Sequence, residues 1–150
     1  MEFNKSVVTK QGRELMTKLL AKKAVTEFTQ VATTSTEYQD SQLEELTALS
    51  NIKQTAKAQA YSNNKTTVSA TAAINNEGLK EGYYINTVGL YATDPDEGEI
   101  LYSVSTAKVN GYMPPDAGVS KSGFSFTIYA EVGNSEQVDV TVDPSGYANK

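Results

Sequence analysis

The chain opens with a helical pattern of apolar residues. Between Lys10 and Ala24 these residues recur at intervals of three and four, so that they share one helix face. They are Leu15, Met16, Leu19, Leu20 and Ala24. Thr9 is the expected N-cap, whereas Gly12 at the third helical position spoils a capping box. The opposite face carries Arg13, Lys18, Lys22 and Lys23. We therefore expect an amphipathic helix that lies on a sheet and turns its basic face to solvent.

A strand and a second, shorter helix are predicted next. Residues 25–34 are rich in Thr, Val and Phe, which favour strands. The segment from Ser41 to Glu44 has capping-box spacing, and leucines follow it at helical intervals. These leucines are Leu43, Leu46 and Leu49. The pattern predicts a helix over residues 41–50.

From residue 52 onward the apolar period changes to two, which is typical of half-buried strands. The runs over 52–60 and 68–74 flank the turn-forming residues 62–65, so they predict a hairpin. Its buried face consists largely of alanine, and we expect the first helix to pack closely on it. Further strands are expected over 83–92, 100–108, 124–132 and 138–142. Turns or loops separate them at 94–98, 110–118 and 133–135.

The resulting fold prediction is an α+β domain. It is an antiparallel β-sandwich of about seven strands, with the N-terminal helix and the second short helix packed on it. Pro144 cannot donate to a strand ladder, so pairing ends there or lies at a sheet edge. We therefore place one domain over residues 1–145 and the start of a linker at 146–150. Deleting residues 146–150 should then leave the melting temperature unchanged.

Composition removes several function classes. The 150 residues include one arginine but no cysteine and no histidine, and the chain carries a net charge of −5. Disulfides, an ordinary zinc site and a serine-hydrolase triad are therefore excluded. A single arginine on an acidic chain also argues against nucleic acid as a partner. No apolar stretch approaches the ~20 residues of a membrane span, and no secretory signal is present. We expect synthesis in the cytoplasm without membrane insertion.

The acidic turn is one candidate for chemistry. It contains Asp94, Asp96, Glu97 and Glu99. Clustered carboxylates can bind calcium, but this spacing does not match a calcium loop and Pro95 stiffens it. Paired carboxylates can also hydrolyse glycosides, although so common a residue type gives no specific signal. We expect a solvated turn with no metal, no cofactor and no catalysis.

Tyrosines form the second candidate cluster. They are Tyr83, Tyr84, Tyr91 and Tyr102. In an uninterrupted strand, Tyr83 and Tyr91 share one face and Tyr84 lies on the other. Such a split favours cross-strand packing within a sheet. A stacking platform for a sugar or for single-stranded nucleic acid remains the alternative.

Three blocks of the sequence resemble the phage tail-collar fibre protein family, in that family's order. The first is 8–16 leading to 28–31, and the second is 46–51. The third is 82–92 with its acidic hairpin and 99–102. Its central residues are Gly89, Leu90, Tyr91, Ala92, Gly98, Ile100, Leu101 and Tyr102. The chain departs from the family at Thr87, where an acidic residue is common, and at 32–36, where Gly-Asp-Gly is common.

The resemblance implies a virion structural protein. In that family this module is the N-terminal part that attaches a tail fibre or receptor-binding protein to the tail tip or baseplate. The implied partners are other tail or baseplate proteins, with homo-oligomerisation through a downstream fibre region. The eight central residues would be structural. The alternative function is a carbohydrate-binding β-sandwich that contacts the host surface, and Tyr84 or Tyr91 would then carry the sugar.

Overall fold

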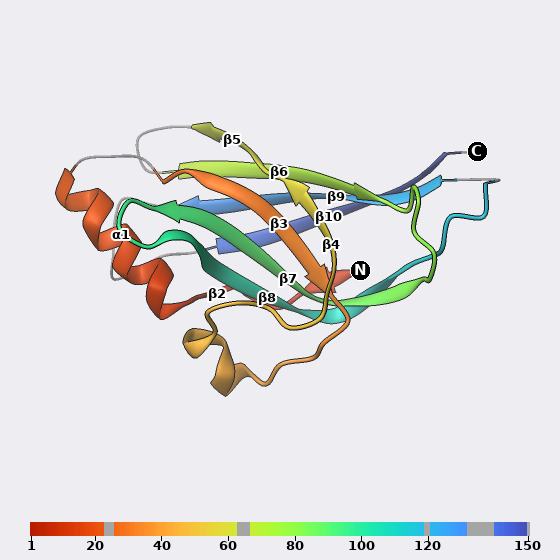
Figure 1. Ribbon diagram of the computed structural model, residues 1–150, viewed down its shortest axis with the longest axis horizontal. Coiled ribbons are helices and arrows are strands. Elements are labelled where there is room, and N and C mark those ends of the chain that lie inside the picture. Colours follow the sequence, from red (N-terminus) through yellow and green to blue (C-terminus); the bar gives the residue numbers. More distant parts are fainter. Residues whose placement is uncertain (23–25, 63–66, 119–120, 132–139, 150) are drawn as a thin grey trace.

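A computed structural model describes residues 1–22, 26–62, 67–118, 121–131 and 140–149. Two antiparallel sheets face each other, as predicted for an α+β sandwich (Figure 1). The larger sheet has the order β1-β8-β7-β3-β4, and β2 pairs with β8 beside it. Its strands are β1 (Glu2–Phe3), β2 (Val7–Val8), β3 (Phe28–Thr34), β4 (Ile52–Lys57), β7 (Tyr83–Asp94) and β8 (Gly98–Met113). The smaller sheet has the order β10-β9-β6-β5. Its strands are β5 (Gln59–Ser62), β6 (Thr67–Asn75), β9 (Lys121–Glu131) and β10 (Val140–Asn149).

Ten strands are present in the described residues, against the seven expected. Two of the additional strands, β1 and β2, have only two residues each, which is too short for a period to show. The third arises because the run over 52–60 divides at Ala58. The N–H of Ala58 donates to the Thr29 carbonyl, where the chain leaves the larger sheet. β4 therefore pairs with β3, and only β5 forms the expected hairpin with β6.

Apolar side chains gather in two clusters. The main core lies between the sheets and includes Val31, Leu90 and Phe126. A second cluster lies on the outer face of the larger sheet, beneath the segment that carries Leu43 and Leu49. The alanines Ala58, Ala70 and Ala72 belong to the main core. Their small side chains allow close approach of the facing sheet.

The first helix, α1 (Lys10–Lys22), forms as predicted but not over the alanine face. It contacts β8 and lies at one end of the sandwich (Figure 1). Leu15 and Met16 are buried in the main core. Leu20, which was expected on the same buried face, is 37% exposed, and Ala24 lies outside the described residues. Its basic face is also less free than expected, because Arg13 pairs with Glu44 at 3.9 Å and Lys18 pairs with Asp94 at 3.0 Å. No helix in the described part of the chain is long and apolar enough to cross a membrane.

The second helix is shorter than predicted. Only η1 (Asp40–Glu45) is helical, and it is a 3-10 helix. Its capping box uses Gln39 and Gln42 instead of Ser41 and Glu44. Leu43 belongs to η1 and is buried in the second cluster, whereas Leu49 reaches the same cluster from the loop that follows η1. The helical spacing of the leucines thus reflected a shared burial site more than a continuous helix.

Two strand boundaries differ from the expectation. β8 continues through Gly111 to Met113, where a loop was predicted. β10 continues through Pro144 to Asn149, so pairing does not stop at the proline. β10 is an edge strand, where alternate N–H groups point away from the partner and leave places that tolerate proline. The expected turn at 133–135, and residues 63–65 of the expected turn at 62–65, lie outside the described residues.

This extension of β10 reverses the expected effect of a truncation. Residues 146–149 pair with 121–124 of β9. Deleting residues 146–150 should therefore lower the melting temperature, since the end of β9 would lose its outer partner. Thermal unfolding followed by circular dichroism measures the change. An unchanged melting temperature would mean that these residues add nothing to the fold.

Candidate functional site

The three blocks that carry the family resemblance meet at the β7–β8 hairpin. Thr9 opens α1 and accepts a hydrogen bond from the Gly12 N–H at 3.0 Å, as expected of an N-cap. The Thr9 N–H donates to the Tyr102 carbonyl at 3.0 Å, and its hydroxyl donates to the Leu101 carbonyl. The first block is thereby attached directly to the third.

Gly12 explains how closely the helix approaches this strand. A Cβ added at Gly12 would overlap the backbone carbonyl oxygen of Tyr102 and lie 2.9 Å from a methyl group of Val8. Glycine is therefore required by the helix–strand contact. From the sequence alone, Gly12 only spoils a capping box, so its role in the close helix–strand contact is not predictable.

The second block reaches the hairpin from its outer face. A Cβ added at Gly89 would lie 2.8 Å from Leu49 Cδ1 and 2.9 Å from Leu101 Cδ1. The Leu49 N–H also donates to the Tyr91 hydroxyl at 3.3 Å. Burial raises the pKa of Tyr91, although this hydrogen bond opposes the shift. Gly89 thus marks a close approach inside a strand, as such a glycine often does.

The other central residues of the third block divide between the two faces of the larger sheet. Leu90 is buried on the inner face together with Val88 and Ala92, as predicted. Ile100 and Tyr102 join them there, whereas Tyr91 and Leu101 belong to the outer cluster. Gly98 closes the turn at φ +81°, a left-handed conformation that favours glycine.

Tyr102 is fully buried, and its ring meets Phe28 edge to face with centroids 5.2 Å apart. Its hydroxyl has no hydrogen-bond partner among the residues that the structure describes. Burial alone raises the pKa of this phenol far above its usual value.

Tyr102→Phe should leave the free energy of unfolding unchanged or increase it by up to about 1 kcal/mol. The variant keeps the ring and removes a buried polar group that costs about 1–3 kcal/mol when unpaired. Urea unfolding of both proteins measures the difference. A loss above about 1 kcal/mol would show that the hydroxyl has a partner after all.

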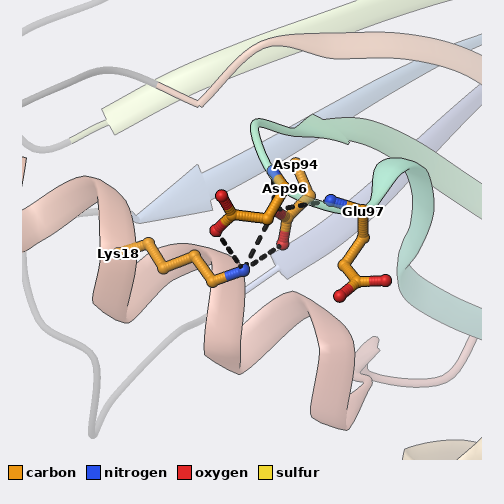
Figure 2. A network of polar contacts seen from close by, with 4 residues as sticks. All are labelled: Lys18, Asp94, Asp96 and Glu97. Atoms are coloured by element: carbon orange, nitrogen blue, oxygen red, sulfur yellow. Dashed lines mark hydrogen bonds and ion pairs between the residues drawn. The ribbon is translucent and has the colours of Figure 1, made fainter.

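The acidic turn is an ion-paired contact between α1 and the hairpin (Figure 2). Asp94 is only 3% exposed, and its carboxylate lies 3.0 and 3.1 Å from Lys18 Nζ. Asp96 approaches the same ammonium group at 3.0 Å. The N–H groups of Asp96 and Glu97 donate to Asp94 Oδ1 at 2.8 and 3.2 Å. The expectation of a solvated turn is therefore wrong for Asp94, which holds the turn and the helix together.

Two opposing effects set the protonation of Asp94. Burial acts to raise its pKa, but the Asp96 N–H, Lys18 and the Glu97 N–H outweigh burial and hold the pKa below its usual value. Hydrogen bonds from Lys18 to Asp96 and Asp94 raise the pKa of Lys18. Within the described residues, no group of three or more acidic side chains is arranged to hold a metal ion.

Asp94→Asn should destabilise the fold at pH 7, and the difference should disappear in acid. Because the folded pKa is lowered, the Asp94 carboxylate contributes stability above its unfolded pKa of about 3.9. That contribution is lost as the pH falls through the folded pKa. Melting temperatures from pH 7 to pH 2 measure the gap. The exposed Asp40→Asn is the matched control, and a pH-independent gap at Asp94 would contradict this assignment.

Tyr83 and Tyr91 do not share a face, contrary to the even spacing between them. The β7–β8 register shifts between Ile85 and Thr87, which reverses the inward-outward alternation. Tyr83 therefore faces the main core, where its hydroxyl meets Thr33 at 2.7 Å and donates to Gln54 at 2.6 Å. Burial raises the pKa of Tyr83 to about 12. Tyr91 faces the outer cluster, so neither side chain is available to stack on a ligand.

Tyr84 alone among the four candidate tyrosines is exposed, at 54%, and it has a partner that the sequence did not reveal. Tyr112 lies opposite it on β8, with ring centroids 4.9 Å apart and planes at 49°. The sequence predicts a loop at Tyr112, so only the register of β7 on β8 reveals this pair.

The two places where the chain departs from the family pattern are in contact. The buried Thr87 hydroxyl donates to the Thr36 carbonyl at 2.8 Å. Asn86 next to it donates to the Ser35 carbonyl at 2.9 Å. A threonine at position 87 thus suits this particular neighbouring segment.

Comparison of the chain with protein-family models, with curated proteins and with solved structures found no match.

Proposed function

We propose that this chain is the N-terminal module that attaches a phage tail fibre or receptor-binding protein to the tail tip or baseplate. One observation carries the proposal. The blocks that resemble the tail-collar fibre family lie far apart in sequence but form one contact unit, in which Thr9 and Gly12 meet Tyr102 and Leu49 meets Gly89. The residues that carry the resemblance are therefore also the residues that hold these distant segments together, which supports a fold shared with that family.

The motif residues act structurally in this proposal. They fix α1 and the loop with Leu49 onto the β7–β8 hairpin. The partners would be other tail or baseplate proteins, and homo-oligomerisation would come from a downstream fibre region. The protein would reside in the virion after synthesis in the host cytoplasm. No catalysis, cofactor or nucleic acid enters this role.

Particle fractionation tests the attachment role. Lysates of the strain that encodes the chain are separated on a density gradient, and an antibody to the chain follows it across the fractions. We expect it to sediment with intact tailed particles and to remain there after a high-salt wash. A chain found only in the soluble fractions, while the particles contain their other tail proteins, would contradict the proposal.

Carbohydrate binding is the second candidate function. The exposed Tyr84–Tyr112 pair favours it, because exposed aromatic faces can stack on the apolar face of a sugar ring. Tyr91 is removed from this candidate by its burial at 8% exposure and by its hydrogen bond to Leu49.

A further inference from the structure

The Tyr84–Tyr112 pair is held in place by the backbone beneath it. A Cβ added at Gly82 would lie 2.8 Å from Cζ of Tyr112. The ring of Tyr112 therefore lies against the chain at Gly82, while Tyr84 supports it from across the ladder. Two aromatic rings with half their surface exposed are thus fixed side by side on the outer face of the larger sheet.

A pair of amides continues the row along the same two strands. Asn110 Nδ2 donates to Asn86 Oδ1 at 3.0 Å, and Asn86 Nδ2 donates to the Ser35 carbonyl at 2.9 Å. Asn86 is thereby oriented from both sides. Its partner Asn110 still offers a carbonyl oxygen that accepts no hydrogen bond from the described residues.

A polar hollow adjoins the amide pair. Its volume is about 510 Å³, and its lining includes Asn86, Gln39 and Thr106. Small-molecule sites commonly measure about 300–1,000 Å³. Because Asn86 belongs to both the amide pair and the hollow, rings, amides and hollow form one continuous row.

The charge of the hollow restricts what can bind there. Glu37 and Asp40 line it, and within the described residues neither carboxylate has a cationic partner. The whole chain carries a net charge of −5. An anionic polymer would be repelled, whereas an uncharged ligand or one with amino groups would not.

We propose that this row binds a glycan built of neutral or amine-bearing sugars. One sugar stacks on Tyr84 and Tyr112, and the next hydrogen-bonds to Asn110 and the polar lining of the hollow. A protein partner is the less suitable occupant, because stable protein interfaces bury about 800 Å² per partner around an apolar centre. Two half-exposed tyrosines beside a polar hollow do not provide such a centre. The proposal rests on the second candidate function and not on the attachment role.

Titration calorimetry of the whole chain with three probes tests this site. The probes are a chitin hexasaccharide (neutral), a chitosan hexasaccharide (amine-bearing) and a hyaluronan hexasaccharide (anionic). Tyr84→Ala and Tyr112→Ala should each weaken binding of the neutral or amine-bearing probe by about tenfold or more. Tyr129→Ala is the matched control, since Tyr129 is 42% exposed on the other sheet, and it should leave binding unchanged. Circular dichroism confirms that each variant is folded.

Several outcomes would overturn the glycan site. They are no binding of the neutral and amine-bearing probes, equal binding of the anionic probe, or equal loss in Tyr129→Ala. Purified tail particles that bind the chain in a Tyr84-dependent way, without glycan binding, would assign the row to a protein interface instead. If the chain sediments with particles but binds no glycan, only the glycan site is contradicted. If the chain binds glycan but never enters particles, only the attachment proposal is contradicted.

Discussion

Leu90→Ala should lower the free energy of unfolding by about 2–4 kcal/mol. Leu90 is 1% exposed, and its strand β7 pairs with β3 on one side and β8 on the other. Truncation leaves a cavity among Val31, Val88 and other members of the main core. A central strand that is paired on both sides has little freedom to collapse into that cavity. Most of the transfer free energy of the removed methyl groups, and of the cost of the cavity, should therefore appear as lost stability.

Urea unfolding measures this loss, with Leu20→Ala as the matched control. Leu20 lies on α1 and is 37% exposed, so the same truncation should cost well under half as much there. A loss below about 0.5 kcal/mol at Leu90 would be typical of a surface position. It would show that the register of β7 is wrong.

Gly12→Ala should destabilise the protein by about 2–3 kcal/mol, against the trend of helix propensity. In an exposed helix the same change stabilises by about 1 kcal/mol. Here the new methyl group would overlap the carbonyl oxygen of Tyr102, which is backbone and cannot rotate away. The helix must move off β8, and the hydrogen bonds from Thr9 to that strand weaken with it.

The sign of the stability change in Gly12→Ala separates the effect of helix propensity from the steric overlap with Tyr102. Glu14→Ala, at an exposed position of α1, serves as the control for helix propensity and should be close to neutral. Chemical denaturation of the three proteins gives the comparison. A Gly12→Ala variant as stable as the parent, or more stable, would mean that α1 does not approach β8 as closely as described.

Periodicity predicted the strands and the first helix because burial on one face is a local property of the sequence. The alternation in β6, β7 and β9 placed each of these strands, and Thr9 began the helix where its side chain could cap it. β6 pairs with β9 without a register shift, whereas β7 is buried on both faces from Thr87 to Ala92 and shifts register twice against β8. The antiparallel sandwich followed from these strands.

Features that depend on distant partners were not predictable in this way. The division at Ala58 depends on the Thr29 carbonyl, and the shift at Ile85 depends on the pairing of β7 with β8. That shift placed Tyr83 and Tyr91 on opposite faces. Likewise, β10 continues through Pro144 because it is an edge strand, which sequence alone left open.

The same distinction between local patterns and distant contacts holds for the candidate sites. Leu90 was expected to be buried from its own strand pattern, and it is. The exposed row around Tyr84 required knowledge of Tyr112, Asn110 and the segment at 37–40, which meet only in three dimensions. The ion pair of Lys18 with Asp94 joins residues 76 positions apart. A charge pattern along α1 cannot reveal it.

Electron microscopy of particles made without this chain tests the proposed attachment role most directly. The gene is deleted from the genome that encodes it, and particles are imaged before and after complementation with the intact chain. We expect assembled tails that lack their fibres or tip appendage, with both restored by complementation. Tails that carry normal fibres in the absence of the chain would contradict it.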